Sequence, residues 1–293
     1  MPGTDHQGLR RPHLTDDERN EITTLAAICN AHDGLDLKLS IGLPHPEADQ
    51  AAGDFLFYTD RRLVGYCALD SSNGSPFELC GMVHPDYRRR GIGRALLQAA
   101  MAESGQRGSA RLLMICEDAS TSGRGFAATA GGTYRFSEYR LELDRTAFDQ
   151  RLPVPTRLTL QRAGWPDLEM LVHILAASFD DPEEEVRARI ARGLADPSDH
   201  YYLAHVDDTP IGSIRASIAG NDASLYAFGV LPAYRGRGLG REILSRTVET
   251  LLAANHGHIG LEVETDNRNA LGLYVSCGFR EVTTYGYYHL ELV

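Results

Sequence analysis

The 293-residue sequence contains one lysine and one tryptophan, and its longest apolar runs fall far short of the roughly 20 residues that a membrane-spanning helix needs. Residues 1–13 are polar and lack the apolar core of a signal peptide. The five cysteines are scattered and form no C-x-x-C pair, which argues against a disulfide scaffold or a cysteine-rich zinc module. His256 and His258 have no third ligand near them in the sequence, so a surface turn is expected there. These absences predict a cytoplasmic protein with no membrane segment and no bound metal.

The charge balance restricts the ligands that the protein can attract. Forty acidic residues against 29 basic ones give a formal net charge of -11, so the overall field repels nucleic acid and anionic membranes. A polyanionic ligand would need a local basic pocket. Because Lys38 is the only lysine, almost all positive charge lies on arginine, whose planar guanidinium suits phosphate contacts.

An internal repeat organises the chain. Residues 83–94 match residues 230–241, and each matching pair lies 147 residues apart. The offset holds without a gap from Gly65 and Gly212, through Glu117 and Glu264, to Gly131 and Gly278. The repeat predicts two copies of one domain, at residues 1–150 and 151–293, joined by a linker that contains Pro153 and Pro155.

The second copy mixes helical and strand patterns. Helices are expected at residues 166–178, 182–194 and 267–277, and a further helix is expected after the glycine-rich turn, where Leu244, Val248, Leu251 and Leu252 form one apolar stripe. Strands are expected at residues 200–206, 210–217, 224–230, 259–265 and 285–292. The predicted class is α+β, or mixed α/β, with about 140 residues per domain.

The pattern R-x-x-G-x-G stands between an apolar strand and an amphipathic helix in both copies. Glycines let the backbone approach a ligand, and the first N–H groups of a helix attract anions. Arg235, Arg237 and Arg241 add local positive charge. An ordinary glycine turn is the alternative, but the recurrence in identical context favours a pyrophosphate site. A dinucleotide fingerprint would need glycine at Ile243, and a Walker loop would need G-K-[ST].

The pattern V-x-P-x-Y-R-x-R-G-[IL]-G resembles motif A of the GNAT (Gcn5-related) N-acetyltransferases, and residues 267–279 resemble motif B of that family. The resemblance implies two tandem GNAT domains, each a twisted mixed sheet flanked by helices, and acetyl-CoA as the cofactor. Its implied contacts in the second copy are Phe228, Gly229, Val230, Arg235, Gly236, Arg237, Gly238, Leu239, Gly240, Arg241 and Asn267. Those in the first copy are Val83, Arg88, Arg89, Arg90, Gly91, Ile92, Gly93 and Arg94.

Acetyl transfer to an amine requires a deprotonated amine, stabilisation of the oxyanion and a proton for the departing thiolate. Tyr274 stands where the family places the acid, although it also fits an apolar helix face. Glu262 is the candidate base, and Glu264, on the same strand face, is the alternative. Glu262 and Tyr274 correspond to Ile115 and Ala127 in the first copy, which predicts that the first copy is non-catalytic.

The acceptor stays open at this stage. The tandem layout resembles that of the mycothiol synthases, in which the C-terminal half carries out the chemistry, but the position of their additional strand glutamate is Ser224 here. Small-molecule amines such as amino sugars, and protein N-terminal amines, are both candidates. A non-catalytic acyl-CoA-binding or regulatory protein is the alternative from another class.

Overall fold

The computed structural model describes residues 7–11, 13–39, 53–70, 76–151 and 157–292. These residues divide into two compact units. Unit 1 comprises the described residues up to Ser137 together with those from Thr283 onward, and unit 2 spans Glu138–Val282. Each unit is an α+β domain with its own set of strands and its own buried core.

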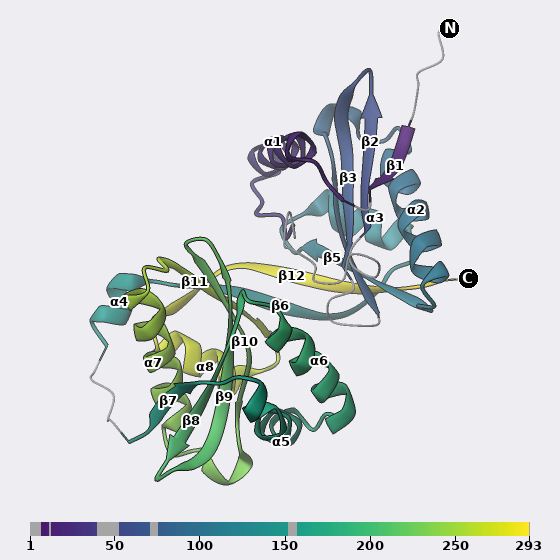
Figure 1. Ribbon diagram of the computed structural model, residues 1–293. Coiled ribbons are helices and arrows are strands. Elements are labelled where there is room, and N and C mark those ends of the chain that lie inside the picture. Colours follow the sequence, from purple (N-terminus) through teal and green to yellow (C-terminus); the bar gives the residue numbers. More distant parts are fainter. Residues whose placement is uncertain (1–6, 12, 40–52, 71–75, 152–156, 293) are drawn as a thin grey trace, which may run out of the picture. The chain divides into compact units, whose positions relative to one another are not determined.

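Unit 2 contains a mixed sheet in the order β6-β11-β10-β9-β8-β7, in which only β10 and β11 are parallel (Figure 1). Its strands are β7 (Thr159–Arg162), β8 (Asp199–Val206), β9 (Thr209–Ala219), β10 (Asp222–Val230), β11 (His258–Glu264) and the last part of β6 (Thr133–Leu143). Its helices are α4 (Arg145–Asp149), α5 (Leu168–Phe179), α6 (Glu183–Ala195), α7 (Leu239–Ala253) and α8 (Arg268–Ser276).

Side chains of β8 alternate between the two faces of this sheet. Tyr201 and Leu203 pack with α5 and α6, whereas Tyr202 and Ala204 belong to the larger cluster built around α7. The period of two is that of an extended strand, and both sets of side chains are buried. Figure 1 shows α5 and α6 covering one face of the sheet and α7 the other.

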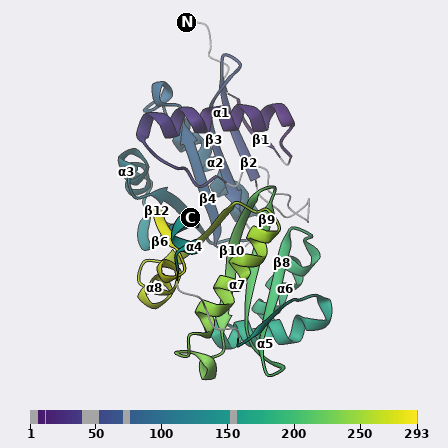
Figure 2. The ribbon, with the colours of Figure 1, turned by 90° about the vertical axis from the view of Figure 1, so that its left-hand side faces the viewer.

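Unit 1 repeats this plan, with strands in the order β1-β2-β3-β4-β5-β12 and only β4 and β5 parallel. The strands are β1 (Gln7–Arg11), β2 (Gly53–Thr59), β3 (Arg62–Asp70), β4 (Phe77–Val83), β5 (Arg111–Glu117) and the last part of β12 (Phe279–Glu291). The helices are α1 (Asp16–Asp33), α2 (Ile92–Gln106) and α3 (Thr121–Thr129). Figure 2 shows α1 lying across β3 and β4, and α2 covers the opposite face.

The two sequence repeats exchange their last strands. β6 follows α3 of the first copy, yet its residues Glu138–Glu142 pair with Glu264–Gly260 of β11. β12 follows α8 of the second copy, yet its residues Tyr285–Glu291 pair with Glu117–Arg111 of β5. Leu141 is therefore buried in the core of unit 2 and Leu290 in the core of unit 1. The compact units thus cut across the repeats at 1–150 and 151–293, because each copy supplies a strand to the other sheet.

The fold class predicted from the sequence is confirmed. The helices and strands expected in the second copy are all present, with ends that shift by a few residues, and β12 begins earlier than expected, at Phe279. No helix in the described part of the chain is long and apolar enough to cross a membrane. The cysteines are free thiols, and Cys277 is buried in the core of unit 2.

The strand exchange leads to a reciprocal prediction. Leu141→Ala should lower the stability of unit 2 and Leu290→Ala that of unit 1, each by about 2–5 kcal/mol, because each substitution leaves a cavity in that core. Hydrogen exchange followed by mass spectrometry should show faster exchange in β11 and α7 for Leu141→Ala, and in β5 and α2 for Leu290→Ala. The opposite assignment would show that each copy keeps its own last strand.

Candidate active site

The candidate site of unit 2 lies where its two parallel strands separate. β10 and β11 pair only over Asp222–Leu225 and His258–Leu261, so the later residues of both strands diverge. At this point β10 contains a bulge: between its pairs at Tyr226 and Gly229, two residues face one residue of β9. Ala227 has a φ of 47°, a left-handed conformation that is rare for alanine. The bulge leaves backbone groups of β10 outside the ladder with β9, next to the point where β10 and β11 separate.

The glycine-rich turn follows directly after β10. Gly236 and Gly238 have φ values of 73° and 78°, and a Cβ atom at Gly236 would have nothing within 4 Å. Gly238 caps α7, whose first hydrogen bond runs from Glu242 N–H to Gly238 C=O at 3.2 Å. The amides of residues 239–241 therefore have no acceptor within the helix and point out of its N-terminus. An open backbone with unpaired donors is the arrangement that binds a phosphate.

The arginines of the turn have different roles. Arg235 donates from Nε to Val230 C=O at 2.8 Å and from Nη2 to Ser178 C=O at 2.9 Å, so its guanidinium fastens the turn to β10 and α5. Arg237 is exposed and lies 5.5 Å from the ring centre of Tyr234. Arg241 is also exposed. Arg235 is exposed as well, but its guanidinium is held by the two backbone carbonyls, and within the described residues no such hydrogen bond holds those of Arg237 and Arg241 at the start of α7.

Two charged residues that the sequence did not single out hold this turn in place. Glu242 is completely buried, and its Oε1 accepts hydrogen bonds from the backbone N–H groups of Arg157 and Leu158 at 2.6 and 3.1 Å. Arg157 donates from Nε to Glu242 Oε2 and from Nη1 to Arg237 C=O. The position that corresponds to Glu242 in the first copy is Ala95. This difference between the two repeats is the sequence signal that could have identified Glu242.

The remaining predicted cofactor residues form the walls of the turn and the gap. The side chain of Leu239 is buried, so only its backbone is available to a ligand. Gly229 packs closely, because a Cβ there would lie 2.7 Å from Ser178 Cβ. A Cβ at Gly240 would meet Leu273 at 3.5 Å. Asn267 caps α8 through Oδ1, which accepts from Ala270 N–H at 3.1 Å.

Tyr274 lies on α8 between two aromatic rings. Its ring centre is 6.4 Å from that of Phe228 on β10 and 6.2 Å from that of Phe279. Burial raises the pKa of its hydroxyl to about 12, so the side chain keeps its proton at neutral pH. A partly buried, protonated phenol beside Phe228 of the bulged strand is a candidate proton donor.

The two candidate carboxylates lie on one face of β11. Leu261 and Val263 are buried on the opposite face, whereas Glu262 is half-buried and Glu264 is exposed. Arg140 of β6 stands opposite Glu262 in the ladder. Of the two glutamates, Glu262 is therefore the one that is partly shielded from solvent.

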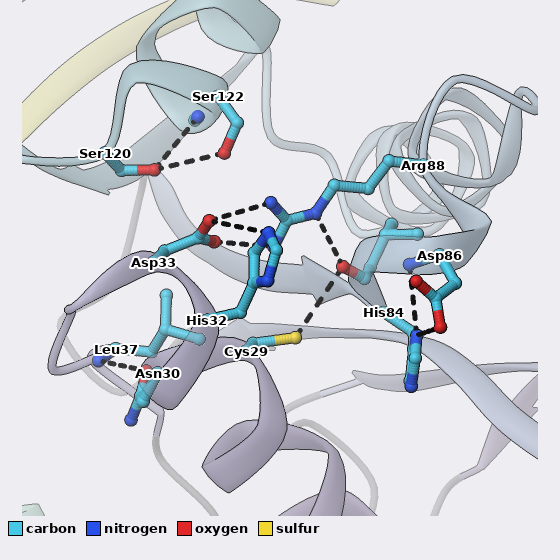
Figure 3. Close-up of polar contacts among 12 residues, drawn as sticks. Cys29, Asn30, His32, Asp33, Leu37, His84, Asp86, Arg88, Ser120 and Ser122 are labelled. Atoms are coloured by element: carbon cyan, nitrogen blue, oxygen red, sulfur yellow. Dashed lines mark hydrogen bonds and ion pairs between the residues drawn. The ribbon is translucent and has the colours of Figure 1, made fainter.

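The counterpart in unit 1 keeps the turn but lacks the other parts. Arg88 donates to both carboxylate oxygens of Asp33, at 3.0 and 2.6 Å, and to Val83 C=O at 3.0 Å, so its guanidinium points toward the end of α1 (Figure 3). These hydrogen bonds lower the pKa of Asp33. The pairing of β4 with β3 has no bulge. Ala127, where the second copy has Tyr274, is completely buried.

The other predicted residues of the unit 1 turn follow the same pattern as unit 2. Arg90 donates to Asp86 C=O at 2.8 Å and lies over the Tyr87 ring. Gly91 caps α2 with a φ of 85°, and the side chain of Ile92 is buried. A Cβ at Gly93 would lie 3.3 Å from the Phe126 ring, and Arg94 is exposed.

The comparison with known proteins agrees with this geometry. A model described as the acetyltransferase (GNAT) family matches residues 168–279, and one described as an acetyltransferase (GNAT) domain matches residues 52–131. A mycothiol acetyltransferase from Kineococcus radiotolerans is 31% identical to this chain over 92% of both proteins. The chain belongs to the GNAT acetyltransferase family.

Two further GNAT proteins are similar to this chain. The N-alpha-acetyltransferase RimI of Mycobacterium tuberculosis is 37% identical over 43% of this chain and 76% of that protein. The crystal structure of a GCN5-related N-acetyltransferase from Sphaerobacter thermophilus has a TM-score of 0.76 over 97% of this chain and 96% of that one, at 19% identity. The chain is thus an N-acetyltransferase with two GNAT domains in tandem. Within the described residues, no cluster of three or more His, Cys, Asp or Glu side chains could hold a metal ion.

The backbone of the two GNAT turns allows a test of their strain. Arg89 has a φ of 63° at the position where the second copy has Gly236. Because a side chain in this region costs about 1 kcal/mol relative to glycine, Gly236→Ala should destabilise the protein by about that amount and Arg89→Gly should stabilise it. Urea unfolding curves would measure both changes. Equal effects of the same sign would contradict the left-handed geometry at one of the two turns.

Proposed function

We propose that the protein is an acetyl-CoA-dependent N-acetyltransferase that acts on a primary amine by direct attack on the thioester, and that the chemistry takes place in unit 2. The observation that carries the proposal is the coincidence, in unit 2, of a bulged strand, an open glycine turn and a protonated tyrosine around one gap. Unit 1 has the turn without the bulge or the tyrosine.

The residues of unit 2 fit the diphosphate of coenzyme A. The amides at the start of α7 supply neutral donors, and the exposed guanidinium groups of Arg237 and Arg241 supply positive charge. Arg235 and the pair of Arg157 and Glu242 position the turn. When bound, acetyl-CoA supplies an activated acyl group. A backbone N–H of β10 near Val230 polarises its carbonyl, and Asn267 lines the cofactor side.

The remaining steps are proton transfers by side chains of this chain. Glu262, directly or through a water molecule that it orders, takes the proton of the acceptor ammonium group, because a protonated amine is not a nucleophile. Tyr274 Oη donates a proton to the departing sulfur. Glu264, which is more exposed, is the alternative base.

For the acceptor, we favour a small-molecule amine of the amino-sugar type. The similarity to a mycothiol acetyltransferase extends over 92% of both chains and so includes both domains, whereas the similarity to RimI covers less than half of this chain. Ser224, on the paired part of β10, occupies the position of the strand glutamate of mycothiol synthases, which argues against the same base and the same substrate here. The exposed Asp222, two residues before it, is a weaker substitute for that glutamate. A protein N-terminal amine is the competing acceptor class.

The function is tested with a panel of acceptors. Mass spectrometry should detect acetyl-CoA-dependent acetylation of at least one amino sugar and less of an N-terminal peptide amine. Tyr274→Phe and Glu262→Gln should each lower kcat by about 10²-fold or more, because each removes a proton-transfer group. An inert thioester with every amine would favour the non-catalytic, acyl-CoA-binding alternative.

The pH profile of kcat tests the role of Tyr274. The raised pKa of Tyr274, about 12, keeps its proton-donating form present as the pH rises, so its ionisation should produce no alkaline fall in kcat below about pH 11. Tyr274→Phe should therefore lower kcat by one constant factor between pH 6 and 9. A wild-type alkaline limb near pH 9 that Tyr274→Phe abolishes would contradict the burial of this hydroxyl.

The assignment of the chemistry to unit 2 can be tested with a matched pair of variants. Gly238 and Gly91 cap equivalent helices with φ values of 78° and 85°, so alanine introduces similar strain at both sites. Gly238→Ala should raise the KM for acetyl-CoA by about tenfold or more, whereas Gly91→Ala should leave turnover largely intact. Loss of turnover in correctly folded Gly91→Ala would show that unit 1 takes part in the reaction.

A further inference from the structure

Unit 1 contains a small pocket where β4 and β5 diverge. These strands pair only over Phe77–Leu79 and Leu112–Met114, and the pocket is lined by the residues that follow, including Cys80, Gly81 and Glu117. With the Lys38 side chain forming part of its wall, the pocket has a volume of about 50 Å³. By the repeat offset, Glu117 corresponds to Glu264, so the pocket occupies the place in unit 1 that the candidate active site occupies in unit 2.

The only lysine of the protein, Lys38, is one of the residues that line this pocket. Lys38 Nζ lies 2.8 Å from Tyr287 Oη, and it stands over the rings of Tyr287 and Tyr285 at 5.4 and 5.7 Å from their centres. Phe136 stacks on the Tyr287 ring with 4.5 Å between ring centres. Both tyrosines are at least 98% buried, so the ammonium group meets a fixed aromatic wall.

The backbone around Lys38 is fastened by hydrogen bonds of its own. Asp36 N–H donates to Glu117 Oε2 at 2.7 Å, and Tyr285 Oη donates to Asp36 C=O at 2.8 Å. Leu37 N–H donates to Asn30 Oδ1 at 3.2 Å, a contact visible in Figure 3. Thr283 donates to the other oxygen of Glu117 at 2.6 Å. The segment 35–39 therefore presents Lys38 to the pocket in a defined position.

The surroundings suit a cation with a short alkyl stem. An ammonium group is attracted to the faces of aromatic rings and donates a charge-assisted hydrogen bond to a phenol oxygen. Burial raises the pKa of the Cys80 thiol and raises that of Cys116 to about 11, so both remain neutral and supply apolar contact for the stem. The nearby carboxylate of Glu117 contributes the opposite charge.

We infer that the pocket of unit 1 is a binding site for a primary alkylammonium ion and that the side chain of Lys38 is its built-in occupant. The site goes beyond the proposed reaction of unit 2. While Lys38 is in place, its own ammonium group holds the contacts to Tyr287 and Tyr285, so a free amine cannot make them. Together with the missing bulge and the missing tyrosine, this occupancy keeps unit 1 from acting on an acceptor.

The first test empties the site and refills it. Lys38→Ala should lower the Tm of unit 1, and n-butylammonium chloride should raise it again in a saturable manner. The wild-type protein should show no such rise, because its site is filled. n-Butanol, which has the same chain without the charge, should not restore the Tm, and Lys38→Ala/Tyr287→Phe should require a several-fold higher concentration of butylammonium.

The result that overturns the inference is equal stabilisation of Lys38→Ala by butanol and by butylammonium, or an equal rise in the wild type. Either one would show that the pocket does not select an ammonium group.

A second measurement uses the intact wild-type protein and needs no destabilised variant. Because Lys38 is the only lysine, peptide mapping after brief treatment with an amine-selective acylating reagent reports on this side chain alone. Lys38 should react at least roughly tenfold more slowly in the folded protein than in the urea-unfolded chain, and Tyr287→Phe should reduce this protection. Equal rates in the folded and unfolded states would overturn the inference.

Discussion

The incomplete pairing of two parallel strands is the constraint on which the site depends. After four paired positions β10 and β11 separate, and beyond this point β10 has a bulge in its pairing with β9. Strand edges left unpaired in the middle of a sheet carry donors and acceptors that need partners. A ligand with an extended amide-bearing arm can satisfy them, and the same strand leads directly into the glycine turn. The gap, the turn and the helix N-terminus are thus consecutive parts of one candidate binding site.

The two units share one fold but differ at the point where their parallel strands separate. In unit 1 the strands also separate after three paired positions, but β4 is regular and residues 37–39 line the gap. The corresponding arginines of the two glycine turns also differ in their hydrogen bonds. Arg235 uses backbone carbonyls alone, whereas Arg88 is committed to the carboxylate of Asp33 as well, which cancels part of its charge. In the proposed mechanism, the difference between the two units depends on a few side chains and one inserted strand residue, and not on the fold.

Much of the fold could be predicted from the sequence because its signals are local. The apolar stripe of α7, the alternation of β8 and the glycines of both turns depend on neighbours within a few residues. The exchange of β6 and β12 could not be predicted, since a strand pattern specifies its buried face and not its partner. Among the site residues, Arg235 was assigned to phosphate from its charge, but its hydrogen bonds to Val230 and Ser178 depend on contacts across the fold.

The strand exchange also explains why the features of unit 1 could not be found in the first copy alone. Lys38 and its partner Tyr287 are 249 residues apart, and β12 of the second copy brings the tyrosine to β5. Folding of unit 1 therefore has to await the last residues of the chain, and such long-range pairing is entropically costly to nucleate. A fragment cut between the two repeats would separate β5 from its neighbour β12, and β11 from its neighbour β6. The repeat describes how the sequence is built. Because each repeat pairs with a strand of the other, the whole chain is needed for folding.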